Sequence, residues 1–321
     1  MHKVVFFTGF KGFASDVFID LKPPGYEVTV YDDRMMSDDQ KVEKVRDADF
    51  ILSLGGPLTD KVMQAARNVK LIQLASAGFD TVDLNAAKRL GIPVCNMGMP
   101  IAPAVAEHAV LMMLGVMRRV VQADGLMRRG EWRNEETACM DVPELAGSTV
   151  GIVGLGNIGR TVARYLRGFE PTTLYADIVR YPDVERELGV RHVPLDELLK
   201  SSDIVTVHVP LNDKTRRLIG ERELGLMKPT AILVNASRGP VVDEKALIEA
   251  LKAGKIAGAG LDVFEQEPTP PDNPLRSMKN VLLSPHIAGN SAPTWSRRAK
   301  FAFENFQRVL EGKPPLSQVN A

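Results

Sequence analysis

The sequence predicts an α/β protein with two parallel-sheet domains and a cleft between them. Two series of short β-rich runs alternate with helical patterns, which is typical of parallel strands joined by crossover helices. A long helical pattern separates the two series, and a glycine-rich turn follows the first strand of the second series. The length of 321 residues also suits two domains better than one hydrophobic core.

The first hundred residues contain the first alternating series. Its β-rich runs lie at 3–9, 26–32, 49–55, 70–76 and 92–96. Between them, apolar residues recur with helical spacing at 38–48, 59–69 and 82–91. We therefore expect the chain to begin with a parallel sheet covered by helices.

A helical pattern rich in Ala, Leu and Met runs from 104 to 129 and connects the two series. Its first half is apolar over much of its surface, which predicts a buried helix. The second series has β-rich runs at 149–154, 172–177, 204–210, 231–237, 258–264 and 281–286. A last helix is expected over 292–310, and we expect it to return to the first domain.

Composition argues against several classes of protein. Forty basic residues balance forty acidic ones, so the chain lacks the overall charge of a protein that binds nucleic acid or an anionic membrane. The two cysteines, Cys95 and Cys139, give neither a disulfide framework nor a metal-ligand pattern. The N-terminus has the pattern of a strand rather than a signal peptide, and the longest apolar run, which ends before Arg118, is too short to span a bilayer. We expect a cytoplasmic protein without metal, nucleic-acid or membrane partners.

The run GIVGLGNIG places Gly154, Gly156 and Gly159 between a strand and a helix. In this pattern the first glycine permits a tight turn, the second lets the backbone approach a pyrophosphate, and the third lets helix and strand pack closely. The pyrophosphate would face the free N–H groups and the positive dipole end of the helix. The alternative is a plain strand–turn–helix whose glycines serve packing alone.

Asp177 ends the next β-rich run and bears on the choice of cofactor. A carboxylate at this point accepts hydrogen bonds from the adenosine ribose diol and would repel the 2′-phosphate of NADP. The sequence therefore predicts NAD rather than NADP. Arg180 lies three residues further on and would soften this preference if it turned toward a phosphate. The alternative for Asp177 is a turn or helix-capping residue.

Three further polar residues follow successive runs of the second series. Arg238 follows 231–237, Glu267 lies just beyond 258–264, and His286 ends 281–286. The carboxyl ends of parallel strands lie along one edge of the sheet, where ligands bind. A guanidinium binds a carboxylate by two parallel hydrogen bonds, an imidazole exchanges a proton with a carbonyl or hydroxyl oxygen, and a carboxylate orients the ring and favours its protonated form. Each residue alone is more often structural, but together they predict proton transfer on a carboxylic acid.

These residues lie in segments that resemble the D-isomer-specific 2-hydroxyacid dehydrogenases. The matching segments span nearly the whole chain in the family's order: ASAGFDTVD, AVAEHAVLMML, GSTVGIVGLGNIG, HVPLNDKTRRLIG, LVNASRGPVVDEKAL, AGAGLDVFEQEP and LLSPHIAG. Each segment is weak alone, whereas the set is specific. The resemblance implies a flavodoxin-like substrate (catalytic) domain over 1–98 plus 291–321 and a Rossmann-like NAD-binding domain over 99–290.

The resemblance also implies roles for single residues. It implies that Arg238, Glu267 and His286 are the catalytic trio, and that backbone N–H groups of a loop in the first domain hold the substrate carboxylate together with Arg238. That loop consists of Ser76, Ala77 and Gly78. Besides the three glycines and Asp177, the implied cofactor contacts are Asn157, Ile158, Val209, Pro210, Ala236, Ser237 and Asp262. The segments NMGMPIAPAVAEH and HIAGNSAPTW depart from the family pattern, which leaves the contacts of 290–295 open.

Together, the residues and the resemblance predict an NAD-dependent oxidoreductase that transfers a hydride between the nicotinamide and a small 2-keto or 2-hydroxy acid. Glyoxylate, hydroxypyruvate, phosphohydroxypyruvate, 2-ketogluconate and branched 2-keto acids all remain open. A homodimer through the dinucleotide domain is expected, because family members are commonly dimers and 104–117 is apolar. The alternative is that this apolar stripe belongs to the core of a single chain. The alternative function is a dinucleotide-sensing binding protein that resembles the family's corepressor branch.

Overall fold

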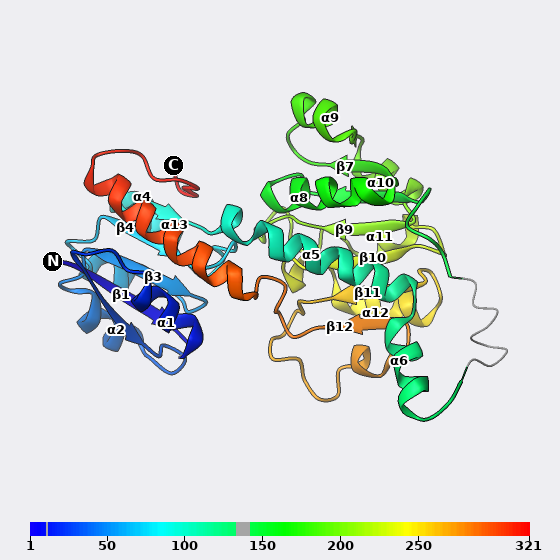
Figure 1. Ribbon diagram of the computed structural model, residues 1–321, viewed down its shortest axis with the longest axis horizontal. Helices are drawn as coiled ribbons and strands as arrows, with labels where there is room; N and C mark the ends of the chain where they lie inside the picture. Colours follow the sequence, from blue (N-terminus) through cyan, green and yellow to red (C-terminus); the bar gives the residue numbers. More distant parts are fainter. Residues whose placement is uncertain (11, 133–141) are drawn as a thin grey trace. The chain divides into compact units, whose positions relative to one another are not determined.

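The computed structural model describes residues 1–10, 12–132 and 142–321 (Figure 1). The chain divides into two compact units: unit 1 comprises Met1–Ile101 with Asn290–Ala321, and unit 2 comprises Ala102–Gly289. The domain boundaries expected from the sequence, after residues 98 and 290, lie near the boundaries of these units. Cys139 lies outside the described residues.

Unit 1 contains a five-stranded parallel sheet in the order β2-β1-β3-β4-β5. Its strands are β1 (His2–Thr8), β2 (Tyr26–Tyr31), β3 (Phe50–Leu54), β4 (Leu71–Leu74) and β5 (Val94–Cys95). The order reverses between β1 and β3, which is the switch point of a flavodoxin-like sheet. Near the end of the chain, Gln318 pairs with Cys95 of β5 in an antiparallel bridge.

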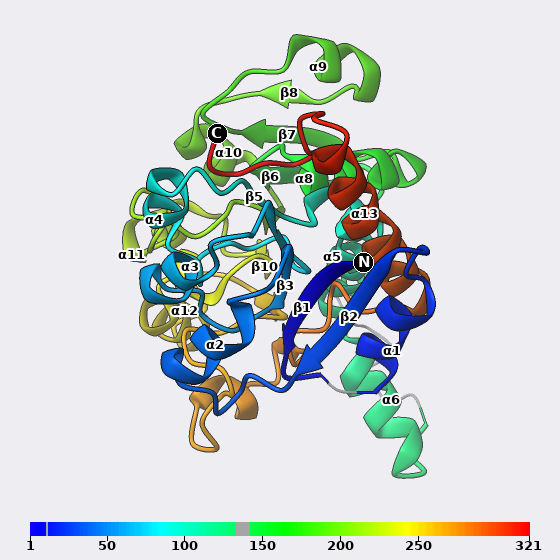
Figure 2. The same ribbon diagram turned by 90° about the vertical axis from the view of Figure 1, so that its left-hand side faces the viewer.

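Helices cover both faces of the sheet of unit 1 (Figure 2). One face carries α2 (Asp38–Val45), α3 (Asp60–Ala65) and α4 (Leu84–Arg89), and the other carries α1 (Phe13–Asp20) and α13 (Ala292–Leu310). Mainly aliphatic side chains fill the first face, whereas aromatic rings gather on the second, where Phe50 and Phe306 stack with ring centroids 4.3 Å apart. The last helix thus has the predicted bounds and belongs to unit 1.

Unit 2 contains a seven-stranded parallel sheet in the order β12-β11-β10-β9-β6-β7-β8. Its strands are β6 (Thr149–Val153), β7 (Thr172–Ala176), β8 (Arg191–His192), β9 (Ile204–Val207), β10 (Ile232–Asn235), β11 (Gly258–Leu261) and β12 (Val281–Leu283). The strand order reverses between β6 and β9. In such sheets, ligands bind at the carboxyl ends of the strands beside that reversal.

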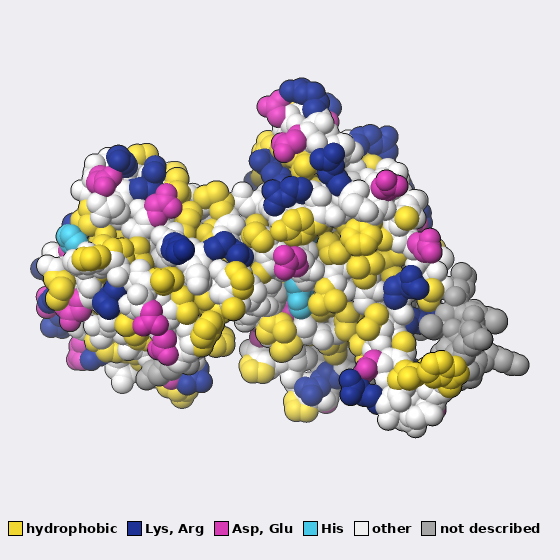
Figure 3. Space-filling model, viewed as in Figure 1, with side chains coloured by type: hydrophobic (Ala, Val, Ile, Leu, Met, Phe, Trp, Pro, Cys, Tyr) yellow, Lys and Arg dark blue, Asp and Glu magenta, His cyan; other side chains and the backbone are white. Residues whose placement is uncertain are grey.

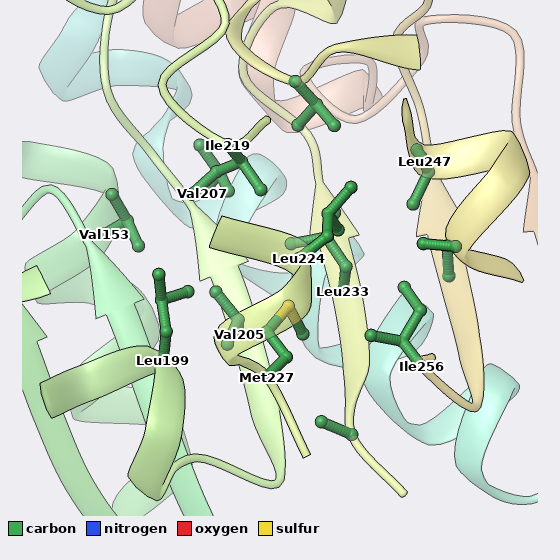
Figure 4. Packing of buried hydrophobic residues seen from close by; sticks show 14 of the residues in the cluster. Val153, Leu199, Val205, Val207, Ile219, Leu224, Met227, Leu233, Leu247 and Ile256 are labelled. Atoms are coloured by element: carbon green, nitrogen blue, oxygen red, sulfur yellow. The ribbon is translucent and has the colours of Figure 1, made fainter. Parts of the chain in front are cut away.

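Two layers of helices bury the sheet of unit 2. In the described part of this unit the helices are α5 (Gly98–Met117, which begins in unit 1), α6 (Val120–Arg128), α8 (Asn157–Leu166), α9 (Pro182–Leu188), α10 (Leu195–Ser201), α11 (Glu221–Leu226) and α12 (Glu244–Lys252). Short 3₁₀ turns cover Arg167–Phe169, Gly239–Val241 and Pro274–Ser277. Figure 4 shows the aliphatic core on one face, where Leu199, Leu224 and Leu247 meet Val205 and Leu233 of the central strands. The other face packs α5 and α8 against a second buried cluster.

The single helix expected over 104–129 is two helices. α5 ends at Met117, and α6 begins at Val120 after Arg119, whose φ of 49° lies in the left-handed region. The continuous prediction was wrong because arginine favours helices and gives no break signal. The two helices also differ in burial: α5 fills the core, while no residue of α6 is buried.

α5 is apolar because it packs inside unit 2. Gly260 of β11 lies against this helix, and an added Cβ there would come within 3.0 Å of the Met112 Cβ. The helix is also 20 residues long, so it is long and apolar enough to cross a membrane by length and composition. The prediction that this run is too short was therefore wrong, since the helix starts at Gly98 rather than 104. Core helices of globular proteins pass the same test, and Ala106, Ala109 and Met113 of α5 are fully buried.

Candidate active site

Arg238, Glu267 and His286 follow three strands that are neighbours in the sheet of unit 2, namely β10, β11 and β12. The parallel register therefore brings the three segments to one edge, as the sequence predicts. The His286 Nδ1 atom lies 2.6 Å from Glu267 Oε2. This short contact between two ionisable groups is the central feature of the site.

The backbone before Glu267 approaches the segment after Arg238 very closely. An added Cβ at Gly239 would lie 1.9 Å from the Phe264 carbonyl oxygen, so only glycine fits there. The Phe264 N–H donates to Glu267 Oε1 over 3.0 Å and fixes the carboxylate. The glycine after Arg238 thus lets the chain bring the guanidinium segment beside the carboxylate segment.

Glu267 is held in its ionised form. Partial burial opposes ionisation, but hydrogen bonds from His286 and the Phe264 N–H, with the charges of His286 and Arg238, lower the pKa of the Glu267 carboxyl below its usual value. Arg238 thus contributes to the same electrostatic field. Its Nη1 donates to the Ser237 carbonyl oxygen over 2.9 Å, which restrains the guanidinium. The three groups can together bind an anion and supply or accept a proton.

His286 sits in an unusual backbone conformation that Asp262 maintains. The φ of His286 is 54°, in the left-handed region, which a non-glycine residue adopts only when its surroundings fix it. Its N–H donates to the Asp262 carbonyl oxygen over 2.8 Å. The Asp262 carboxylate accepts the next two N–H groups, from Ile287 at 2.9 Å and Ala288 at 2.8 Å. Asp262 therefore shapes the turn that presents His286.

Sequence reasoning missed two residues of this region. The Ser284 hydroxyl donates to the Asp262 carboxylate, and His108 Nε2 of α5 lies 2.9 Å from the same hydroxyl. Burial opposes ionisation of Asp262, but hydrogen bonds from His108, Ser284 and the two N–H groups lower its pKa. The available signal was an ionisable residue within an apolar helical pattern at AVAEHAV.

The glycine turn in unit 2 has the geometry of a dinucleotide-binding loop. Gly154 has a φ of 95°, and an added Cβ at Gly159 would lie 2.1 Å from the Gly154 carbonyl oxygen. By contrast, an added Cβ at Gly156 meets no atom within 4 Å. Protein packing therefore explains two of the glycines but not Gly156, which directly precedes α8. A diphosphate that approaches the backbone there would account for it.

Asp177 lies beside this turn at the end of β7. Its carboxylate accepts hydrogen bonds from the Leu155 N–H over 2.7 Å and the Val179 N–H over 3.1 Å. A carboxylate has about four lone-pair sites, so acceptor positions remain for a ribose diol. Asp177 thus holds the turn in place and fits the predicted cofactor.

The other predicted cofactor residues of unit 2 gather at the same edge of the sheet. They are Asn157 and Ile158 in the first turn of α8, Val209 and Pro210 after β9, and Ala236 and Ser237 after β10. Asp262 is only 1% exposed, and its side chain faces the His286 turn. Among the described residues, no cluster of three or more His, Cys, Asp or Glu side chains could hold a metal ion.

The predicted substrate loop, Ser76–Gly78, belongs to unit 1 and follows β4. The Ser76 hydroxyl donates to the Gly78 carbonyl oxygen over 2.9 Å. Asn96, which sequence reasoning also missed, donates from Nδ2 to the Ala77 carbonyl oxygen over 2.7 Å. Carbonyl oxygens of the loop are thus occupied by side chains of unit 1.

Known proteins resemble both the sequence and the fold. Residues 110–288 match the family model described as D-isomer specific 2-hydroxyacid dehydrogenase, NAD binding domain. A glyoxylate reductase of Korarchaeum cryptofilum is 43% identical over 310 residues, which are 96% of this chain and 90% of that protein. One of Thermofilum pendens is 46% identical over 290 residues, which are 88% of this chain and 85% of that protein.

Solved structures agree with this relationship. A glyoxylate reductase from Paecilomyes thermophila superposes with a TM-score of 0.86 at 30% identity and covers 99% of this chain and 98% of that one. An NADPH-dependent glyoxylate/hydroxypyruvate reductase from Sinorhizobium meliloti, in complex with NADP and malonate, has a TM-score of 0.84 at 30% identity, over 99% and 97% of the two chains. The chain therefore belongs to the D-isomer-specific 2-hydroxyacid dehydrogenases and is an NAD-dependent oxidoreductase.

Proposed function

We propose that this enzyme reduces glyoxylate, or a 2-keto acid of similar size, to the 2-hydroxy acid with NADH. The observation that carries the proposal is the 2.6 Å contact between His286 and Glu267 beside Arg238. Seven curated relatives named glyoxylate reductase, 40–46% identical to this chain, support the choice of acid. A D-3-phosphoglycerate dehydrogenase of Archaeoglobus fulgidus is also 41% identical, but this chain covers only 49% of it.

Each of the three residues has a defined part in the proposed reaction. Arg238 binds the substrate carboxylate through its guanidinium fork. The imidazolium of His286 donates its proton to the carbonyl oxygen as hydride arrives at C2, and neutral His286 takes the hydroxyl proton in the reverse direction. Glu267 stays ionised, orients the ring and stabilises the imidazolium. The bound NADH supplies the hydride.

The remaining predicted residues complete the proposed site. The N–H groups of the Ser76–Gly78 loop bind the substrate carboxylate together with Arg238. The free N–H groups at the start of α8, near Gly156, receive the cofactor diphosphate, and Asp177 accepts the adenosine ribose hydroxyls. The accessible backbone at Gly156 supports this placement.

A panel of 2-keto acids tests the proposed function. Glyoxylate, hydroxypyruvate, phosphohydroxypyruvate, 2-ketogluconate and a branched 2-keto acid would each be assayed with NADH and with NADPH. The proposal predicts the highest kcat/KM for glyoxylate with NADH. A higher value for phosphohydroxypyruvate or a branched acid would contradict the substrate assignment. Tight NADH binding without turnover of any acid would instead favour a dinucleotide-sensing binding protein.

We also propose that the enzyme is a cytoplasmic homodimer that assembles through unit 2. α6 has no buried residue, and Val120, Val121 and Met127 are each more than half exposed. Apolar side chains gather over this helix in the space-filling view (Figure 3). A second copy that covers them would bury this apolar area. Sedimentation should give a dimer for the parent protein and a monomer for Val121→Asp, and a monomeric parent would contradict the proposal.

A further inference from the structure

The loop after β7 determines how the chain meets the ribose end of a dinucleotide. Asp177 directly follows β7, and Arg180 lies in the same loop before α9. A cation near the adenosine ribose commonly accommodates the 2′-phosphate of NADP. An arginine three residues after Asp177 could therefore oppose the carboxylate's selection of NAD. The contacts of the Arg180 guanidinium show whether it is available to a 2′-phosphate.

The Arg180 guanidinium is paired with Glu185 of α9. Arg180 Nε donates to Glu185 Oε1 over 2.9 Å, and Nη2 donates to Oε2 over 3.0 Å. This is the two-pronged arrangement that makes arginine–carboxylate pairs directional. In Figure 3, acidic and basic side chains lie together over α9. The pairing neutralises the charge of Arg180 near the predicted ribose position.

The carboxylate of this pair is fixed, whereas the guanidinium is exposed. The Tyr175 hydroxyl donates to Glu185 Oε1 over 2.8 Å, and Tyr175 is completely buried in unit 2. The same hydroxyl accepts the Tyr181 N–H over 2.9 Å. The Glu185 side chain is 15% exposed and the Arg180 side chain 65%. Because Glu185 cannot follow a moving guanidinium, Arg180 must leave the pair to reach a phosphate.

Two charged residues near this pair have other partners. Asp183 is paired with Arg186 on the exposed side of α9. The Arg160 guanidinium lies over the Tyr181 ring at 4.3 Å and donates to the Leu155 carbonyl oxygen over 3.0 Å. Hydrogen bonds from Arg180 and then Tyr175 outweigh partial burial and lower the pKa of Glu185 to about 2. Glu185 therefore stays ionised over the working range of pH.

We propose that Glu185 is a specificity-determining residue that withholds Arg180 from the 2′ position of the adenosine ribose. Without this carboxylate, Arg180 would be free to neutralise a 2′-phosphate and offset the repulsion from Asp177. Selection of NAD thus depends on two carboxylates. Asp177 repels a 2′-phosphate, and Glu185 keeps the Arg180 guanidinium from binding that phosphate. The inference rests on the proposed placement of the ribose at Asp177.

Equilibrium binding to four variants tests this inference. Dissociation constants would be measured for adenosine 2′,5′-bisphosphate against 5′-AMP by calorimetry, and for NADPH against NADH by fluorescence. The variants are Glu185→Gln, Arg180→Ala, the double variant with both changes, and Asp183→Asn. The last removes an equal charge from the same helix without touching Arg180. Thermal unfolding would show that each variant folds.

If Glu185 withholds Arg180, only the variant that releases Arg180 should gain affinity for ligands with a 2′-phosphate. Glu185→Gln should tighten adenosine 2′,5′-bisphosphate and NADPH roughly fivefold, the range of an exposed ion pair, and leave 5′-AMP and NADH within about twofold. The gain should vanish in the double variant, and Arg180→Ala and Asp183→Asn should change neither ligand pair by more than about twofold.

Three results would overturn the inference. They are unchanged binding of the 2′-phosphate ligands by Glu185→Gln, an equal gain in the double variant, and loss of NADPH affinity in Arg180→Ala. Loss of NADPH affinity in Arg180→Ala would overturn the inference even if Glu185→Gln does not fold. Failure of the parent protein to bind 5′-AMP or NADH would overturn the ribose placement and the inference together. NADH binding without keto-acid turnover would count against the proposed function alone.

Discussion

Asp262 holds the backbone of the turn that carries His286. It accepts the N–H groups of Ile287 and Ala288 and a hydroxyl from Ser284. These bonds fix the turn in which His286 adopts a left-handed backbone conformation. The direction of the imidazole therefore depends on a buried carboxylate that accepts three hydrogen bonds from this segment.

Asp262→Asn should destabilise the protein and slow the reaction. Asparagine has the same shape as aspartate but only one acceptor oxygen. Its amide group would therefore face one of the backbone N–H groups, and that buried donor would lose its hydrogen-bond partner. We expect a loss of about 1–3 kcal/mol in the free energy of unfolding, measured by urea denaturation, and a lower kcat.

The exposed carboxylate Asp196 provides the control, since it pairs with Arg222 at the surface. Asp196→Asn should change the free energy of unfolding by less than about 0.5 kcal/mol. Equal stability of the Asp262→Asn variant and the parent would show that these hydrogen bonds do not hold the turn.

Residues with a role in the site differ in how visible they are in the sequence. Arg238, Glu267 and His286 could be found because each follows a recognisable strand, and parallel strands bring their ends to one edge. His108 and Ser284 could not, because their contact joins positions 176 residues apart and depends on how α5 crosses the sheet. Local patterns reveal which residues end an element, but not which side chains meet from distant elements.

At the scale of elements, β5 and the loop after β4 are held by a buried polar network. Gln73 Nε2 donates to the carbonyl oxygens of Leu74 and Cys95, and Asn305 of α13 donates to Gln73 Oε1. Asn96 extends this network to the Ala77 carbonyl oxygen. Occupying that oxygen fixes the peptide planes of the loop, which sets where the adjacent N–H groups point.

Asn96→Ala should weaken substrate binding without weakening cofactor binding. Loss of the 2.7 Å hydrogen bond to Ala77 lets the loop rotate away from the geometry that a carboxylate needs. We expect the KM for glyoxylate to rise about tenfold, equivalent to a charge-assisted contact of about 1.4 kcal/mol. The dissociation constant of NADH, measured by fluorescence, should change by less than about twofold.

Asn320→Ala is the matched control. Asn320 also bonds the backbone beside β5, through the Val94 N–H and the Ile92 carbonyl oxygen, but it does not touch the Ser76–Gly78 loop. A similar rise in KM for both variants would mean that Asn96 acts through general stability rather than through the loop.

Strongly periodic elements could be predicted with their bounds, whereas the two-residue strand β8 and the break between α5 and α6 could not. The helix over 292–310 has a clear apolar stripe and was predicted with its bounds. β8 has two residues, too few to show alternation. The break between α5 and α6 rests on one left-handed residue, Arg119, and no sequence signal for such a residue exists when it is not glycine or asparagine.

At the scale of the whole molecule, one buried histidine makes stability depend on pH. His208, which follows β9, bonds Thr206 through Nε2, and its Nδ1 has no hydrogen-bond partner among the described residues. Burial lowers the pKa of His208 to about 4. The unfolded chain takes up this proton near pH 6.5, whereas the folded chain does not until a lower pH.

The sign of the effect follows from this difference. Between pH 6.5 and 4 the unfolded state binds more protons, so the free energy of unfolding falls as the pH falls. We expect His208 to account for a loss of about 1.5 kcal/mol between pH 6.5 and 5. His208→Gln cannot be protonated and should show a correspondingly flatter dependence in urea denaturation over this range. An equal pH dependence of the free energy of unfolding in parent and variant would show that His208 does not cause it.

In the proposed reaction His286, oriented by Glu267, exchanges the proton with the substrate oxygen. The most direct test compares His286→Ala with the parent protein in kcat for glyoxylate reduction and in the dissociation constant of NADH. We expect kcat to fall about 10²- to 10⁴-fold, the usual contribution of a positioned proton donor, while NADH binding changes by less than about threefold. A kcat within a few-fold of the parent value would contradict this role of His286.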